Sequence, residues 1–247
     1  NNNKLNQPYI KMCVETIVKW CGESFNICLI NDDSLHKLLS NWSINLDKLP
    51  EPIKTRTRQL GLFRLLHKYG GVVVPNSFLM MRDLLPYHKE YLGKKGCYVG
   101  EFVTRNNTSE KKRLFPSHKL VGCEKNNKTM KDLCNYLEVS LSTDNSAAAD
   151  FEGNLDRNLF KNVNSGVMSV VPGNLLGTKT QKGYVILLDD LLKESHIDFD
   201  SDMFGIYLPK EELLKRRNYE WFVRSNKVQI LSGNTILSKM FTLSYSN

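Results

Sequence analysis

Apolar residues recur about every 3.6 positions in several stretches of the chain, and this period predicts amphipathic helices. The clearest stretch runs from Ile53 to Tyr69 and ends at Gly70-Gly71, two glycines that allow a tight turn after a helix. Another follows Pro8 and stops before Gly22. Further helices are predicted over residues 34–39, capped by Asp33 or Ser34, and over residues 127–139 and 211–219.

Short and continuously apolar runs predict buried strands between these helices. The run Phe25–Ile30 is followed by an acidic turn, and the run 72–74 stops at Pro75, because proline cannot donate a ladder hydrogen bond. Other strands are predicted at 97–102, 165–171 and 205–208, a strand passing into a short helix at 185–192, and a short helix or turn at 81–85. This alternation predicts an α/β sheet with helices on both faces.

The length of 247 residues suits a single domain with a sizeable core. The net charge of +8 permits an anionic partner, but the basic residues are dispersed and no nucleic-acid-binding motif accompanies them. We therefore expect a solvated basic surface and no nucleic-acid partner. No apolar run is long enough to span a bilayer, so no membrane span is expected.

The six cysteines follow no metal-ligand spacing, and no C-x-x-C is present. Four lie in apolar runs, among them Cys13 and Cys28, which predicts small core side chains in a reducing compartment. The chain begins at Asn1 without methionine. We expect it to be part of a longer protein, with a strand or an anchor preceding it.

The stretch Thr57–Val74, a helix that ends in Tyr69-Gly70-Gly71 before a short strand, resembles the signature of the sugar-binding "DXD" glycosyltransferases. This group includes initiating α-mannosyltransferases and capsular polysaccharide synthesis proteins. The resemblance implies a GT-A-like, Rossmann-like fold: a mostly parallel sheet with helices on both faces, its first strand missing from the chain. It also implies a nucleotide-sugar-binding half at residues 1–90 and an acceptor-side half at 91–247.

At the metal-binding centre this chain departs from the family pattern. The two aspartate positions of the motif hold Pro75 and Ser77, with Asn76 between them, and Gln59 stands at the acidic position of the helix. Neutral side chains bind Mg²⁺ or Mn²⁺ far more weakly than carboxylates. The resemblance therefore implies a degenerate site without a metal, unless other acids such as Asp32 and Asp83 close the gap in space.

Besides a metal site completed by other acids, two explanations of the altered motif stay open. The protein retains the fold for binding alone, or it transfers a hexose without a metal, with Arg56, Arg58 or Arg64 stabilising the leaving diphosphate. The resemblance assigns eight residues to the donor site. In order from the nucleotide side to the diphosphate side, they are Asp32, Asp33, Arg58, Gln59, Gly70, Gly71, Asn76 and Ser77.

Three residues are catalytic candidates on general chemical grounds. His118, which follows Pro116-Ser117, is a possible general base, and Asp150 or Glu152 is suited to orienting an acceptor hydroxyl. The simpler alternatives are a loop histidine without a role and the acidic first turn of a helix.

The composition, rich in asparagine and lysine, and the stretches 74–78, 171–179 and 203–209 resemble glycosyltransferase-like proteins of large DNA viruses. Two functions follow as expectations. The first is a glycosyltransferase-like protein derived from nucleotide-sugar-dependent hexosyltransferases, whose partners would be a nucleotide sugar and a glycan or protein acceptor. The second is a non-catalytic structural or binding component, for example one that contacts other virion proteins. The location implied is a reducing, cytoplasm-like environment or a virion.

Overall fold

The computed structural model describes residues 7–102, 116–143, 148–215 and 217–246, and for residues 148–153 and 215 it describes the backbone only. The strands are β1 (Gly71–Val73), β2 (Phe78–Met80), β3 (Cys97–Glu101), β4 (Pro116–Cys123), β5 (Ser169–Val171) and β6 (Gly205–Tyr207). The helices are α1 (Pro8–Cys21), α2 (Asp32–Leu38), α3 (Ile53–Tyr69), α4 (Leu85–Lys95), α5 (Lys128–Ser142), α6 (Ala148–Asn164), α7 (Leu188–Leu191), α8 (Lys210–Lys215), α9 (Glu220–Arg224), α10 (Lys227–Leu231) and α11 (Ile236–Ser246). Two short 3₁₀ turns span Leu46–Lys48 and Arg217–Tyr219.

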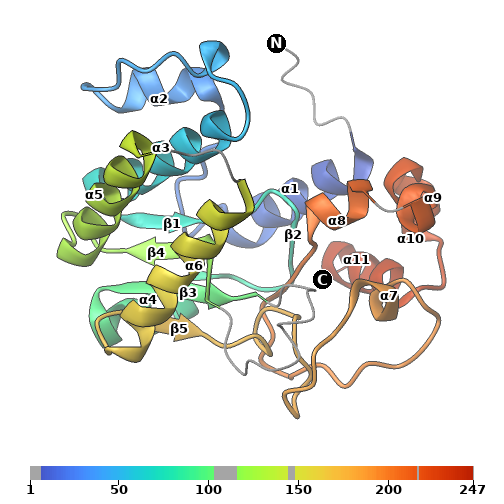
Figure 1. Ribbon diagram of the computed structural model, residues 1–247. Coiled ribbons are helices and arrows are strands. Elements are labelled where there is room, and N and C mark those ends of the chain that lie inside the picture. Colours follow the sequence, from blue (N-terminus) through green and yellow to red (C-terminus); the bar gives the residue numbers. More distant parts are fainter. Residues whose placement is uncertain (1–6, 103–115, 144–147, 216, 247) are drawn as a thin grey trace.

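The main sheet has four strands in the order β1-β4-β3-β5 (Figure 1). β4 runs antiparallel to both β1 and β3, and only the β3–β5 pair is parallel. The sheet is therefore mixed and not mostly parallel as expected, because the long strand β4 inserts in the opposite direction between β1 and β3. β2 and β6 form a separate antiparallel pair with Phe78 opposite Tyr207.

Helices cover both faces of the main sheet, as the alternation of elements predicted. Along β3, Cys97 and Val99 join the core under α3 and α5, whereas Tyr98 between them joins the core on the side of α4. Successive side chains of a strand point to opposite faces, so these are the two faces of one sheet. A third core gathers α1, α10 and α11 around β2 and β6.

The segments with the strongest local signals fold as predicted. α3 occupies the predicted residues 53–69, α1 begins at Pro8 and ends before Gly22, and β3 and β6 fall within their predicted ranges. β5 is shorter than predicted, and α5 begins one residue later. Of the strand and helix predicted at 185–192, the helix forms as α7, whereas Val185 makes an isolated bridge with Lys179 and no strand. The helix predicted at 211–219 ends at Lys215 as α8, and a 3₁₀ turn follows at Arg217–Tyr219. Because β1 from the first predicted half pairs with β4 from the second, the two halves share one sheet.

The predicted buried strand at Phe25–Ile30 is wrong. Residues 26–30 are not paired into either sheet, and Leu29 is 62% exposed. The apolar pattern is that of a strand, but no neighbouring strand of the described chain reaches it. Cys28 in this segment is exposed, which corrects its prediction as a core residue, while the other five free cysteines are buried.

Other elements differ from prediction because their signals are weak locally. Residues 81–85 were expected to form a short helix or turn, but β2 precedes them and the eleven-residue helix α4 begins at Leu85. α2 is capped by Asn31, whose side chain accepts from the Ser34 N–H, and not by Asp33 or Ser34. The polar stretch 105–113, predicted as a loop, lies outside the described residues. Within the described residues, none of the helices has both the length and the apolar character needed to cross a bilayer.

Candidate functional site

Two residues predicted near the nucleotide, Asp32 and Arg58, bind each other. The Arg58 guanidinium donates from Nε and Nη2 to the two carboxylate oxygens of Asp32 at 2.6 and 2.8 Å. Lys54 Nζ lies 3.7 Å from the same carboxylate. The hydrogen bond from Arg58 is the main cause that holds the pKa of Asp32 below its ordinary value. Both charges are thus engaged in joining α2 to α3.

Asp33 and Gln59 were also predicted at the donor site. Asp33 directly follows Asp32 in the sequence, and Gln59 directly follows Arg58. Asp33 is exposed in the first turn of α2. Gln59 is half-buried on α3, and its Nε2 is buried without a hydrogen-bond partner among the described residues. An unpaired buried amide is a cost to folding. Gln59 is also the residue that the resemblance aligns with an acidic position.

The two glycines after α3 have positive φ angles, 74° at Gly70 and 98° at Gly71. A Cβ at Gly70 would lie 2.9 Å from the backbone nitrogen of Lys125, whereas nothing lies within 4 Å of a Cβ at Gly71. Residues other than glycine rarely adopt this backbone conformation. Both glycines are thus required for the turn that carries the chain from α3 into β1.

Asn76 and Ser77, predicted to contact the diphosphate, form the turn between β1 and β2. Ser77 is 2% exposed, and its hydroxyl donates to the Leu208 carbonyl at 2.7 Å. The Leu208 N–H in turn donates to the Ser77 carbonyl at 3.0 Å. Ser77 is thus part of the junction between β2 and β6, while Asn76 is half-buried and lines a large cavity.

Next to this junction, Lys119, Tyr207 and Glu211 form a polar cluster that the sequence did not reveal. Lys119 Nζ donates to Glu211 at 2.9 Å, and Tyr207 is close enough to act on the charge of both groups. The ring of Tyr207 stacks on Phe102, with centroids 4.0 Å apart and the planes 2° from parallel. Because Tyr207 pairs with Phe78 across the two-stranded sheet, the cluster lies one residue from Ser77 in register.

The protonation states of this cluster follow from burial and mutual charge. Burial raises the pKa of Tyr207 to about 12, although Lys119 acts in the opposite direction. Burial alone would lower the pKa of Lys119, but Tyr207 and Glu211 outweigh it and hold that pKa above its ordinary value. Burial would likewise raise the pKa of Glu211, but Lys119 outweighs it and the pKa is lowered. At neutral pH the cluster holds an ammonium, a carboxylate and a neutral phenol.

Of the three catalytic candidates, only His118 has a described side chain. It lies in β4 and not in a loop, and its Nδ1 is 3.0 Å from a carboxylate oxygen of Asp156 on α6. His118 and Lys119 lie where the pairing of β4 with β3 is irregular, between Ser117 and Val121. Their side chains have different partners, Asp156 on α6 for His118 and Glu211 on α8 for Lys119. The backbone of Asp150 and Glu152 lies in α6, and their side chains are outside the described part of the chain.

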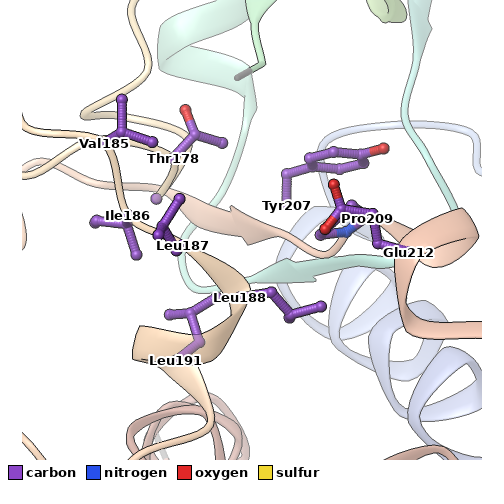
Figure 2. Close-up of a pocket in the computed structure, with 10 residues that line it drawn as sticks. Thr178, Val185, Ile186, Leu187, Leu188, Leu191, Tyr207, Pro209 and Glu212 are labelled. Carbon is purple, nitrogen blue, oxygen red and sulfur yellow. The ribbon is translucent and has the colours of Figure 1, made fainter. Parts of the chain in front are cut away.

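A small recess lies beside the cluster, with Tyr207 and Glu212 on one side and Leu187, Leu188 and Leu191 on the other (Figure 2). Its volume of about 20 Å³ is enough for one water molecule but not for a sugar or a nucleotide.

The large cavity has a volume of about 620 Å³. Its lining includes residues 25–30, β1 with the glycines that precede it, and Asn76. The lining residues carry no charged side chain. Among the described residues, none would therefore offer a diphosphate a cationic side chain in this cavity.

Asp83, proposed with Asp32 as a replacement for the aspartates of the motif, has a structural role of its own. Asp83 accepts from the Ser24 hydroxyl at 2.5 Å and from the Leu85 N–H at 3.0 Å, which places it at the start of α4. Among the described residues, no three histidine, cysteine, aspartate or glutamate side chains gather into a group that could hold a metal ion.

No protein-family model matches the chain, and neither a curated protein nor a solved structure matches it significantly. The glycosyltransferase resemblance therefore stays a prediction from the motif, and the donor-site assignments stay predictions with it.

Proposed function

We propose that the protein is a non-catalytic, glycosyltransferase-like binding protein with a degenerate metal site, derived from nucleotide-sugar-dependent hexosyltransferases of the GT-A type. The observation that carries this proposal is the state of Ser77. At the position where the family resemblance implies a metal-binding aspartate, its buried hydroxyl is committed to the Leu208 carbonyl. A group that holds two strands together is not available to a cation.

The ion pair at the start of α2 supports the same conclusion. The carboxylate of Asp32 is neutralised by Arg58 and Lys54, and the sequence motif would have placed it beside the nucleotide. Residues that would bind a donor in an active relative thus contribute to folding here. The ligands of such a protein would be a glycan or another protein, and a virion protein remains one candidate.

The lysine cluster favours a second candidate function, transfer of a hexose from a nucleoside diphosphate sugar without a metal ion. Lys119 presents a charged ammonium, and its hydrogen bond to Glu211 fixes its position. A preorganised cation of this kind stabilises charge that develops on a leaving diphosphate. Glu211 already balances the charge, which is why we rank this function second.

An assay of nucleotide release tests both candidates. UDP- and GDP-hexoses are incubated with the protein, with Mn²⁺ or with EDTA, and free UDP or GDP is measured. The binding function predicts no release above the rate in buffer. Release that EDTA abolishes would overturn the degenerate-site proposal.

Release that survives EDTA would instead support the metal-independent transferase. In that case Lys119→Met should remove it and Lys131→Met, an exposed lysine of α5, should not. Equal activity of both variants would exclude a role for Lys119.

A further inference from the structure

The large cavity lies in the plane of the main sheet. α3 lines it through Leu65 and Leu66, which belong to the core on one face of the sheet. α1 lines it through Ile17 and Cys21, which belong to the core on the other face. The cavity is thus covered above and below by helices, as an interior strand of an α/β sheet would be.

The backbone at the rim of this cavity has unused hydrogen-bonding groups. Among the residues that the structure describes, β1 pairs only with β4, and its other edge is open. Residues 26–30 are not assigned to a helix or a strand, and none of their backbone groups is hydrogen-bonded to another backbone group of the described chain. Open strand edges of this kind are templates for pairing with another strand.

The size of the cavity suits a single strand. A strand of five residues is about 16 Å long, lies about 4.8 Å from its neighbour on each side and fills a layer about 10 Å thick. These dimensions correspond to roughly 800 Å³. The cavity of about 620 Å³ is of the same order.

We propose that the cavity accepts one extended, apolar β-strand from a partner polypeptide, which pairs with β1 on one side and with residues 26–30 on the other. The absence of charged side chains from the lining selects an apolar strand. The stretches 1–6 and 103–115 of this chain are polar in sequence, so the strand comes from outside these residues. Main-chain hydrogen bonds would give such a complex its affinity, and the apolar lining its specificity.

This proposal names the partner class for the proposed binding role and rests on that role for its biological meaning. The proposed binding role and the strand site can be disproved separately. Metal-dependent nucleotide release would overturn the binding role without affecting the strand site, and failure of strand binding would leave the degenerate donor site as it is.

Cys28 is a reporter for the site, because it lines the cavity and is the exposed one of the six cysteines. The probe is an acetylated and amidated peptide, Lys-Lys-Val-Ile-Val-Ile-Val-Ile-Lys-Lys, and the readout is the rate at which iodoacetamide alkylates Cys28. We expect saturating peptide to slow alkylation at least tenfold. Hydrogen exchange should show new protection of the amides of residues 26–30 and 71–73.

Matched controls separate strand pairing from nonspecific apolar binding. The same peptide with proline at alternate positions cannot form the ladder and should give no protection. Leu29→Lys in the cavity lining should abolish protection, whereas Val139→Lys, at an exposed apolar position of α5, should not.

Three results would overturn the proposal. The first is the lack of protection at millimolar peptide, and the second is equal protection by decanoate, which would indicate an apolar small-molecule site. The third is a dimer of the chain alone in which Cys28 is already protected, because a second copy would then be the occupant.

Discussion

At the scale of single residues, side chains that were predicted to bind the donor form hydrogen bonds within the protein instead. The Asp32 carboxylate accepts two hydrogen bonds from the Arg58 guanidinium, and the Ser77 hydroxyl donates one to the Leu208 carbonyl. These contacts join segments that are 26 and 131 residues apart in sequence. Local sequence patterns could assign these residues to a donor site but could not predict their partners.

The Asp32–Arg58 pair predicts a pH-dependent contribution to stability. Because the folded-state pKa of Asp32 is lowered, the contribution is present above the ordinary carboxyl pKa of about 4 and is lost as the pH falls through the lowered value. Arg58→Met should reduce the free energy of unfolding at pH 7 by about 0.5–1 kcal/mol, since the pair is partly exposed.

Urea unfolding at pH 7, 5 and 3 measures this effect, and the difference from wild type should shrink toward pH 3. Arg224→Met is the control, because Arg224 is 76% exposed and its pair with Glu220 is a surface one. A difference that grows as the pH falls would contradict the assignment.

The buried hydrogen bond of Ser77 predicts the outcome of placing an acid at this position, which the resemblance aligns with a metal-binding aspartate. Ser77→Ala removes a buried hydrogen bond and should cost about 1 kcal/mol, whereas Ser77→Asp places an unpaired carboxylate in a buried site and should cost about 2–4 kcal/mol. Thermal unfolding with and without Mn²⁺ measures both. A strong stabilisation of Ser77→Asp by Mn²⁺ would show that an acid at this position can reach a metal ion, which contradicts the buried, purely structural role given to Ser77.

At the scale of elements, α3 and β1 were predictable because their signals are local. An apolar period, two glycines and a proline lie within 23 consecutive residues, from Ile53 to Pro75. β4 was not predicted, because Gly122 and Pro116 interrupt its apolar pattern and its stability comes from two neighbouring strands. Residues 26–30 have the pattern of a strand without a partner to pair with, so the prediction there failed.

Substitution by alanine should have opposite effects at Gly70, in the turn after α3, and at Gly93, within α4. Gly70→Ala puts a Cβ at φ 74° and ψ −168° and 2.9 Å from the Lys125 nitrogen, and this backbone conformation, essentially confined to glycine, should alone cost about 1–3 kcal/mol. Gly93→Ala in α4 meets nothing within 4 Å and should stabilise by about 0.5–1 kcal/mol through the unfolded state. Chemical denaturation of both variants checks this pair, and destabilisation by Gly93→Ala would show that α4 is not formed as described.

At the scale of the whole molecule, the sequence predicted a single α/β unit with helices on both faces of its sheet. It could not predict that the sheet is mixed, because strand direction depends on β4. The lysine cluster was equally inaccessible, since Lys119 and Glu211 are 92 residues apart. Contacts of that range arise only once the sheet is assembled.

The open edge of the sheet predicts that backbone amides near it are less protected against hydrogen exchange than amides inside the sheet. In the isolated chain, amides of residues 26–30 should exchange with deuterium near the unprotected rate, because they have no backbone partner. Amides of β3 and β4 that bond within the ladder should be the slowest. Hydrogen exchange read by mass spectrometry measures both, and strong protection of residues 26–30 would mean that the segment is already in a sheet.

The degenerate donor site is the central claim, and isothermal titration calorimetry with UDP-glucose and GDP-mannose, each with and without Mn²⁺, tests it most directly. The structure predicts no metal-dependent heat, because Ser77 and Asp32 are committed to contacts within the protein. Micromolar binding that requires Mn²⁺ would contradict the claim.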